Sequence, residues 1–383
     1  MKKRVLSILM AAALTMSMLA GCSSGESESK SSGSSSEETS SDSSGDFSDI
    51  VIGAIVNTTV DDGGWIQAQY EGLQKTMEEL GMSDDQLQVV ENVAETGTDC
   101  TNAAESLIMN GCNFIMGLST GYKSSLESLS QSYPDVQFAQ ADGESMNGNL
   151  IGYQIRSYEG MFLCGYLCGL MSDSDELGYS AGMPEASVIQ GINAYALGAK
   201  YANPNATVRL VFCNSWYDPQ AEAECANSLI SLGIKYMGIN ASSPAIPQAC
   251  EEGGAYCTGY HVDMQDYAPG AVLVSYMWNW EPIFKDMLTK FEEADGTIEE
   301  DYYWGSAEGC ATISDFNQDL VPEDIQEQVR TVQEQITSGE LDVLAGEIKD
   351  NEGNVVVPAG STMEDSVNRN MDFLVDNVIG SLQ

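Results

Sequence analysis

The sequence predicts an α/β protein with parallel sheets in two similar lobes, and three observations support this prediction. The first is a short apolar run rich in β-branched residues, Val51–Val56, followed by a polar loop that contains two glycines. The second is the next segment, Ile66–Leu80, whose apolar residues recur at helical spacing and which ends at Gly81. The third is that such strand–loop–helix units continue along the chain and that short motifs recur 121 residues apart.

The first 21 residues are predicted to be a lipoprotein signal peptide. Three basic residues at positions 2–4 precede an apolar stretch, Val5–Leu19, which is too short for a comfortable membrane span. Leu-Ala-Gly-Cys22 then has the pattern of a bacterial lipobox, which predicts that Cys22 is lipidated and becomes the mature N-terminus. The protein is therefore expected at the extracytoplasmic face of the bacterial cell membrane. An ordinary secretory signal followed by a chance cysteine is the alternative.

A serine-rich segment follows, and residues 22–48 are predicted to be a disordered tether. Between Ser23 and Ser44, 13 of the 22 residues are serine and none is aliphatic, so this stretch cannot bury enough apolar surface to fold. Removing the signal peptide also removes three positive charges and changes the formal net charge from −43 to −46. Such a surface repels nucleic acid, and it argues against a phosphorylated ligand.

The cysteine and histidine content argues against a metal site, and no cofactor is predicted. Ten cysteines less Cys22 leave nine, so at least one is unpaired or pairs with another chain. No C-x-x-C motif is present, and His261 is the single histidine of the chain. Zinc sites in proteins use clusters of cysteine and histidine at short spacings, which this sequence lacks.

The remaining strands and helices are predicted from apolar periodicity and from glycine or proline at the boundaries. The predicted strands are 87–93, 114–117, 136–141, 149–155, 177–181, 208–213, 236–240, 255–260, 271–276 and 355–358. The predicted helices are 101–110, 123–133, 158–171, 187–201, 219–232, 245–252, 281–293, 322–338 and 363–382.

An internal repeat predicts that the two lobes share one organisation. The paired segments are Ser106–Gly111 with Ser228–Gly233, Met116-Gly117 with Met237-Gly238, Asp142 with Asp263, and Val51–Trp65 with Val208–Trp216. Each half would then place a tryptophan after its first strand, a small polar loop after a middle strand and an aspartate after a later strand. Because ligands of parallel α/β sheets lie beyond the carboxyl ends of the strands, these loops are expected to meet at one cleft.

Four motifs in order resemble the basic membrane protein family. They are Asp61-Asp62-Gly-Gly-Trp65-Ile-Gln67-x-x-Tyr70-Glu-Gly72, Asn214-Ser-Trp216-Tyr-Asp218-Pro219, Gly259-Tyr-His-Val-Asp263 and Ser275-Tyr-Met-Trp278-Asn-Trp280. Members are lipid-anchored solute-binding proteins of ABC importers, and several recognise purine nucleosides. The resemblance therefore implies a type I periplasmic-binding fold, in which two Rossmann-like lobes with parallel sheets are joined by crossing hinge strands. It also implies ABC permease and ATPase subunits as partners.

The resemblance implies roles for individual residues. Trp65 falls where the family has an aromatic ring that stacks on the base, and Asp61 and Asp62 fall where acidic groups bind the ligand. Asp263 falls where family members hold ribose hydroxyls, and Trp216 is expected to face the ligand from the second lobe. With the loop and strand-end residues included, the predicted ligand-binding set is Asp61, Asp62, Trp65, Gln67, Ser119, Asp142, Trp216, Asp218, Asp263, Trp278 and Trp280.

One departure from the family widens the choice of ligand. Nucleoside binders of the family often have a lysine where this chain has Trp278, and Trp280 lies two residues further along the same strand. Losing a polar contact and gaining two indoles favours a flatter or less hydroxylated ligand. The expectation is a purine nucleoside or nucleobase. Another flat heterocycle (flavin or thiamine-like), a sugar, or a role as a ligand sensor are the alternatives.

A serine hydrolase is the rival enzymatic interpretation. Gly117-Leu-Ser119-Thr-Gly121 satisfies the G-x-S-x-G pattern between a strand and a helix, and His261 is the one base available to it. A motif of five such common residues arises easily by chance, and the internal repeat explains the loop without catalysis. We therefore expect a binding protein rather than an enzyme, with Ser119 donating a hydrogen bond to the ligand. The predicted lobes are residues 49–156 with 280–309, and residues 157–279 with 310–383.

Overall fold

A computed structural model describes residues 45–143, 148–294 and 296–382. The predicted signal peptide, the lipidation residue Cys22 and most of the predicted tether lie outside these residues. The tether was predicted to reach residue 48, but the packed body begins earlier. Phe47 is buried in the core within a short 3₁₀ helix, Phe47–Asp49, and the backbone N–H of Asp46 donates to the Glu292 carboxylate at 3.0 Å.

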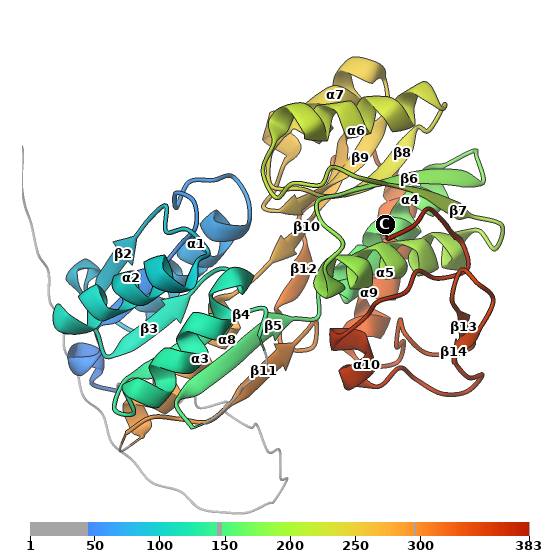
Figure 1. The fold of residues 1–383 in the computed structure, drawn as a ribbon. Coiled ribbons are helices and arrows are strands. Elements are labelled where there is room, and N and C mark those ends of the chain that lie inside the picture. The colour runs from blue at the N-terminus through green and yellow to red at the C-terminus, as the bar shows by residue number, and fades with distance from the viewer. Residues whose placement is uncertain (1–44, 144–147, 295, 383) are drawn as a thin grey trace, which may run out of the picture. The chain divides into compact units, whose positions relative to one another are not determined.

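The first sheet has six parallel strands in the order β11-β5-β4-β3-β1-β2 (Figure 1). Its strands are β1 (Ile52–Ile55), β2 (Leu87–Val90), β3 (Phe114–Gly117), β4 (Gln137–Ala141), β5 (Leu150–Ile155) and β11 (Asp301–Trp304). Its helices are α1 (Trp65–Glu79), α2 (Gly97–Met109), α3 (Lys123–Ser132) and α8 (Glu281–Glu293), with 3₁₀ turns at Asp84–Gln86 and Thr120–Tyr122. The central strands β1 and β3 are apolar and buried throughout because helices cover both faces of the sheet.

The second sheet has seven strands in the order β12-β10-β9-β8-β6-β7-β15, and only β12 runs antiparallel to its neighbour. Its strands are β6 (Glu176–Ala181), β7 (Thr207–Phe212), β8 (Tyr236–Asn240), β9 (Tyr256–His261), β10 (Val272–Trp278), β12 (Ala311–Ile313) and β15 (Val378–Ile379). The helices that follow or flank these strands are α4 (Tyr158–Met171), α5 (Ala186–Ala202), α6 (Pro219–Ser231), α7 (Ala245–Gly253), α9 (Glu323–Thr337) and α10 (Asp365–Arg369). A 3₁₀ turn (Gln265–Tyr267) and a two-stranded sheet, β13 (Ile348–Lys349) with β14 (Val355–Val357), complete the described chain.

The two sheets have the same strand order over their five main strands, as the repeat predicts. Strands β1 to β5 in the first sheet occupy the places of β6 to β10 in the second. This order corrects one prediction, because the strand that contains Val208 is β7 and occupies the place of β2 rather than of β1. Trp216 therefore follows the second strand of its lobe, whereas Trp65 follows the first strand.

The chain crosses between the two sheets after β5, after β10 and after β11. The first sheet takes its strands from residues 52–155 and 301–304, and the second from residues 176–278, 311–313 and 378–379. The predicted lobe boundaries at residues 156, 279 and 309 fall within the three crossing segments. Over the described ranges, no helix is both long enough and apolar enough to cross a membrane.

The helix predicted over residues 363–382 is wrong. Met371, Leu374, Val375 and Val378 are buried at helical spacing, but the only helix in this stretch is α10, and the chain continues in an irregular path to β15. The amide of Asn193 on α5 explains the difference, because it donates to the carbonyl oxygen of Phe373 at 2.8 Å and accepts from the N–H of Val375 at 2.9 Å. These contacts satisfy backbone groups that a helix would have used internally.

Replacing Asn193 with alanine should therefore loosen the C-terminal segment. We expect Asn193→Ala to lower the free energy of unfolding by about 2 kcal/mol, because two buried backbone groups lose their partners. Urea denaturation followed by circular dichroism measures this loss. Asn370→Ala is the matched control, since Asn370 is exposed and its amide donates to the nearby Ser366 carbonyl, and it should change stability by less than about 0.5 kcal/mol. Equal losses for the two variants would contradict the assignment.

Candidate ligand-binding site

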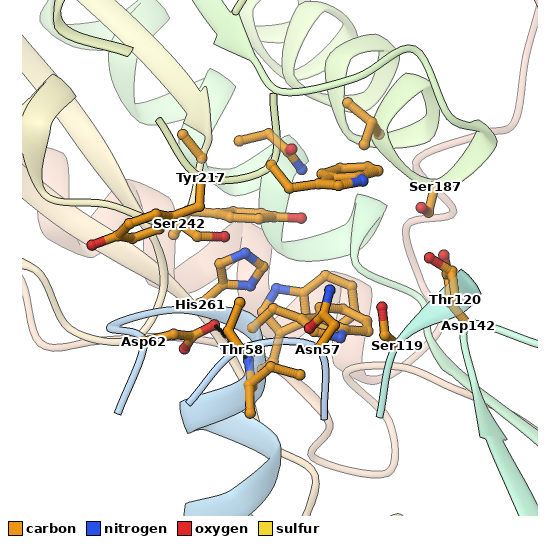
Figure 2. Close-up of a pocket in the computed structure, with 18 residues that line it drawn as sticks. Asn57, Thr58, Asp62, Ser119, Thr120, Asp142, Ser187, Tyr217, Ser242 and His261 are labelled. Carbon is orange, nitrogen blue, oxygen red and sulfur yellow. Dashed lines mark hydrogen bonds between the residues drawn. The ribbon is translucent and has the colours of Figure 1, made fainter. Parts of the chain in front are cut away.

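A cavity of about 100 Å³ lies where loops at the carboxyl ends of both sheets meet (Figure 2). Loops, turns and strand ends of both lobes line it. Its lining residues are Asn57, Thr58, Asp62, Trp65, Ile66, Ser119, Thr120, Asp142, Ser187, Val188, Trp216, Tyr217, Asn240, Ala241, Ser242, Tyr260, His261 and Trp278. One buried water needs only about 10–15 Å³ of such space, so this cavity is large enough for a small organic molecule. The position agrees with the rule that parallel α/β sheets bind ligands beyond their strand ends.

Trp65 forms one wall of the cavity and is held in place by a hydrogen bond and by two other indoles. It is the first residue of α1, and its Nε1 donates to the carbonyl oxygen of Leu118 at 2.6 Å. The ring meets Trp278 edge-on with centroids 5.0 Å apart, and it meets Trp280 in the same way at 5.5 Å. Trp278 and Trp280 stack on each other at 5.3 Å. Trp278 reaches the cavity, whereas Trp280 lies outside its lining at 1 % exposure and packs against Phe284.

Asp62 lines the cavity, but backbone groups already occupy its carboxylate. Its oxygens accept from the N–H groups of Gly64, Ile66 and Gln67 at 2.9–3.3 Å, which caps the start of α1. Gln67 lies outside the cavity lining, where its amide bonds the N–H of Gly63 and the Glu71 carboxylate. Asp61 is exposed and also outside the lining. The acidic turn therefore builds the loop that presents Trp65.

Ser119 and Asn57 are joined to the same carboxylate. The Ser119 hydroxyl donates to Glu95, and the Asn57 amide donates to the same Glu95 oxygen at 3.3 Å. The buried Gln140 amide donates to the carbonyl oxygen of Ser119 at 2.9 Å. Glu95 is outside the cavity lining, so its contribution is to orient two polar side chains that face the cavity.

Asp142 directly follows β4 and has left-handed backbone geometry, with φ of 52°. Its Oδ1 is buried without a hydrogen-bond partner among the described residues. Burial raises the pKa of Asp142 above its ordinary value, and hydrogen bonds with Ser187 and Gln154 offset part of that effect. A buried carboxylate oxygen with free acceptor capacity is suited to an N–H or O–H group of a ligand.

His261, which the sequence-based site did not include, lies at the end of β9 with φ of 70°. It is 6 % exposed, and its Nδ1 has no hydrogen-bond partner in the described part of the chain. Burial lowers the pKa of His261 to about 3, so the imidazole is neutral at physiological pH. A neutral imidazole presents one donor and one acceptor.

Two predicted acidic residues cap local structure instead of lining the cavity. Asp263 is exposed and accepts from the backbone N–H of Gln265 at 3.0 Å, which begins the 3₁₀ turn. Asp218 is the N-cap of α6 and accepts from the N–H groups of Gln220 and Ala221 at 3.1 Å. Trp216, two residues before Asp218, does line the cavity and remains 42 % exposed.

The structure thus brings six predicted residues to the cavity and places five elsewhere. The six are Asp62, Trp65, Ser119, Asp142, Trp216 and Trp278, and the five are Asp61, Gln67, Asp218, Asp263 and Trp280. The further lining residues that sequence reasoning missed include Asn57, Thr58, Ser187, Tyr217, Asn240, Ser242, Tyr260 and His261. Most of them follow a predicted strand within a few residues. This position after a strand is the feature of the sequence that could have identified them as lining residues.

The Ser119–His261 pair lacks the contacts of an activated nucleophile. The Ser119 hydroxyl donates to Glu95 rather than to an imidazole, and no carboxylate in the described chain bonds His261 Nδ1. A serine nucleophile needs a hydrogen bond to its base, and the base needs a third group that orients it. Over the same described residues, no group of three or more histidine, cysteine or acidic side chains is arranged to hold a metal ion.

Two lobes of parallel sheet with a cavity at their strand ends define a type I periplasmic-binding-protein-like fold. Solved structures with this fold include an ABC transporter solute-binding protein from Conexibacter woesei (TM-score 0.63, 18 % identity, 76 % of this chain and 98 % of that one). Another is an ABC transporter solute-binding protein from Aeropyrum pernix (TM-score 0.65, 16 % identity, 79 % and 93 %). These likenesses show the fold, which ABC transporter solute-binding proteins share.

Residues 50–346 match the Bmp family, described as ABC transporter substrate-binding protein PnrA-like, and the chain belongs to this family. A protein named as purine-binding from Brucella abortus is 30 % identical over 330 residues, which are 85 % of this chain and 92 % of that protein. A protein named as a putative ABC transporter glucose-binding protein from Haloferax volcanii is 31 % identical over 287 residues, 75 % and 72 % of the two chains.

The close approach of Gly64 to Ser242 predicts that a larger residue at position 64 would hinder closure of the cavity. A Cβ on Gly64 would lie 2.8 Å from the Cβ and 3.0 Å from the Cα of Ser242, which belongs to the loop after β8 in the other lobe. Gly64→Ala should hold the two loops apart and weaken ligand binding at least tenfold, or about 1.4 kcal/mol. Gly97→Ala is the control, because a Cβ there meets only Ser125 Oγ at 3.9 Å.

Isothermal titration calorimetry gives the affinities, and small-angle scattering gives the radius of gyration with and without ligand. Full affinity and full compaction of Gly64→Ala would show that this contact does not limit closure.

Proposed function

We propose that this protein is an extracytoplasmic, lipid-anchored solute-binding protein that delivers a purine nucleobase or nucleoside to an ABC permease and its ATPase. The observation that supports the ligand class is the combination of flat aromatic walls with buried polar atoms in one cavity. Trp65, Trp216 and Trp278 supply the aromatic surface, and Asp142 supplies a buried acceptor. Family membership supports the transporter partners.

The chemistry of the cavity suits a planar heterocycle with hydrogen-bonding edges. An indole face or edge against a base adds an aromatic interaction to the free energy of burying its surface. Asn240 offers an amide, Asn57 keeps the donor and the acceptor that its bond to Glu95 leaves, and the hydroxyl oxygens of Ser119 and Ser187 can accept. Among the described residues that line the cavity, the ionisable side chains are those of two aspartates, one histidine and two tyrosines, and none is a lysine or an arginine. A neutral ligand fits this set better than a phosphorylated one.

The named relatives support two ligand classes for the same cavity. The relative from Brucella abortus is named as purine-binding, and the one from Haloferax volcanii is named for glucose. A sugar could also lie against an indole while its hydroxyls bond to Asp142 and Asn240. We place the purine class first because three tryptophans offer flat aromatic surface, which suits a planar base better than a puckered sugar ring.

A ligand panel tests this proposal directly. Tagless protein lacking residues 1–22 should show a higher melting temperature with a purine base or nucleoside, because a ligand at 100 times its Kd stabilises the folded state by about 2.7 kcal/mol. The same panel should contain glucose, thiamine and a flavin. Trp fluorescence should change on binding, and the ligand should be recovered chemically unchanged. A rise in melting temperature with glucose alone would show that the protein binds a sugar instead of a purine. Recovery of a cleaved product would indicate an enzyme.

The lipid anchor gives a second prediction. Cys22→Ala removes the thiol that the lipobox predicts to be acylated, so the full-length chain expressed in a bacterium should leave the membrane fraction. Detergent partitioning and metabolic labelling with a palmitate analogue measure the anchor. Cys225→Ala, which changes a cysteine of the folded body, is the control and should stay in the membrane fraction. Membrane association of Cys22→Ala equal to that of the unchanged protein would contradict the anchor.

A further inference from the structure

The described chain has four non-glycine residues with left-handed backbone geometry, and they form two pairs related by the repeat. Asn92 (φ 57°) follows β2 and Asn214 (φ 58°) follows β7, while Asp142 (φ 52°) follows β4 and His261 (φ 70°) ends β9. Because β7 and β9 occupy the places of β2 and β4, each lobe turns its chain at the same two points. His261 is thus the structural counterpart of Asp142.

Asp142 and His261 are alike in a second respect, because each has one buried polar atom without a hydrogen-bond partner among the described residues. Both side chains line the cavity, and Asp142 Oδ1 and His261 Nδ1 are each buried without a hydrogen-bond partner among the described residues. Leaving a buried polar atom unpaired costs free energy, which a ligand that bonds the atom recovers. Two of them on matching turns of opposite lobes point to a ligand that bridges the lobes.

The surroundings of His261 restrict what that ligand can be. Its ring centroid lies 4.0 Å from that of Tyr260, 5.9 Å from that of Trp278 and 5.9 Å from that of Trp65. These rings form apolar walls, and burial lowers the pKa of His261 to about 3, which keeps the imidazole neutral. The carboxylate expected nearby, on Asp263, is exposed and caps the following 3₁₀ turn.

We propose that His261 is a specificity-determining residue and that, together with Asp142, it makes the cavity select a free nucleobase over the corresponding nucleoside; this inference rests on the proposed purine function. A carboxylate can accept from both hydroxyls of a ribose at once, which an imidazole cannot do. A neutral imidazole instead presents a single unpartnered ring atom, Nδ1, to the cavity, and Nδ1 can pair with one N–H or one acceptor on the edge of a base. The ring faces of Trp65 and Trp278 also suit a flat base better than a ribose, whose hydroxyls lose water wherever they lie against an indole face.

Two nearly isosteric substitutions test the proposal at this backbone position. Asn and Asp both tolerate left-handed φ, so His261→Asn and His261→Asp should fold, and their melting temperatures check this. Isothermal titration calorimetry would compare adenine, guanine and hypoxanthine with their nucleosides. The unchanged protein should bind at least one base ten times more tightly than its nucleoside. His261→Asn keeps a donor and an acceptor and should keep that preference.

His261→Asp replaces the donor with a second acceptor, and it should shift the nucleobase-to-nucleoside affinity ratio at least tenfold toward nucleosides. Asp263→Asn is the matched control two residues away and should leave the ratio unchanged. An unchanged ratio in His261→Asp, or nucleoside binding as tight as base binding in the unchanged protein, would overturn the proposal.

A second readout separates ligand contact from a structural role. His261 is the single histidine of the chain, so tagless protein labelled with [¹⁵N]histidine gives one pair of imidazole nitrogen signals. A bound base should move the Nδ1 signal by several ppm as it completes the hydrogen bond. Base binding that leaves both nitrogen signals in place would also overturn the proposal. If no purine of any kind binds, the proposed function itself fails, and calorimetry against the whole panel reveals that separately.

Discussion

The packing of Trp65 against Trp278 and Trp280 is the contact on which the site depends. Trp65 begins α1 of the first lobe, Trp278 ends β10 of the second lobe, and Trp280 precedes α8, which returns to the first. The three indoles therefore join a segment that crosses between the lobes to the wall of the cavity that Trp65 forms. Edge-on aromatic pairs add about 0.5–1.5 kcal/mol each beyond area burial, so the arrangement resists displacement when a ligand arrives. The hydrogen bond from Trp65 Nε1 to Leu118 fixes the ring relative to β3.

The loops around the cavity are held in place by their own hydrogen bonds, without a ligand. In the second lobe the buried carboxylate of Glu222 accepts from the N–H of Asp218 at 3.1 Å and from the hydroxyl of Ser243 at 2.5 Å, which joins the start of α6 to the loop after β8. Burial raises the pKa of Glu222, and these hydrogen bonds offset part of that effect. In the first lobe Asp62 caps α1, and Glu95 joins Ser119 to Asn57. Preorganised loops lower the ordering cost of binding.

The sequence predicted the strands and most helices because they are continuous apolar runs or regular helical patterns bounded by glycine and proline. It failed at residues 363–382, where helical spacing is real but the Asn193 amide holds the backbone in another path. It also missed β11, β12 and β15, which are only two to four residues long and depend on a sheet edge supplied from elsewhere. In the site, the tryptophans were predictable as large aromatic residues after strands. The distinction between Asp142, which faces the cavity, and Asp263, which does not, depends on one turn of backbone.

The backbone turn at the strand end explains why Asp142 and Asp263 differ in position, although the repeat places them at equivalent points of the sequence. Asp142 and Asp263 are 121 residues apart, as are the Met-Gly pairs, yet the left-handed residue at the end of β9 is His261, two positions before Asp263. Asn, Asp, His and Gly are the residues that tolerate such a backbone, and all but glycine bring a short hydrogen-bonding side chain. A left-handed turn at a strand end therefore restricts the cavity to a few chemistries. An aspartate and a histidine can replace each other at such a position without rebuilding the loop. The exchange replaces a charged acceptor with a neutral group that can donate and accept, and it changes which edge of a ligand the lobe can bind.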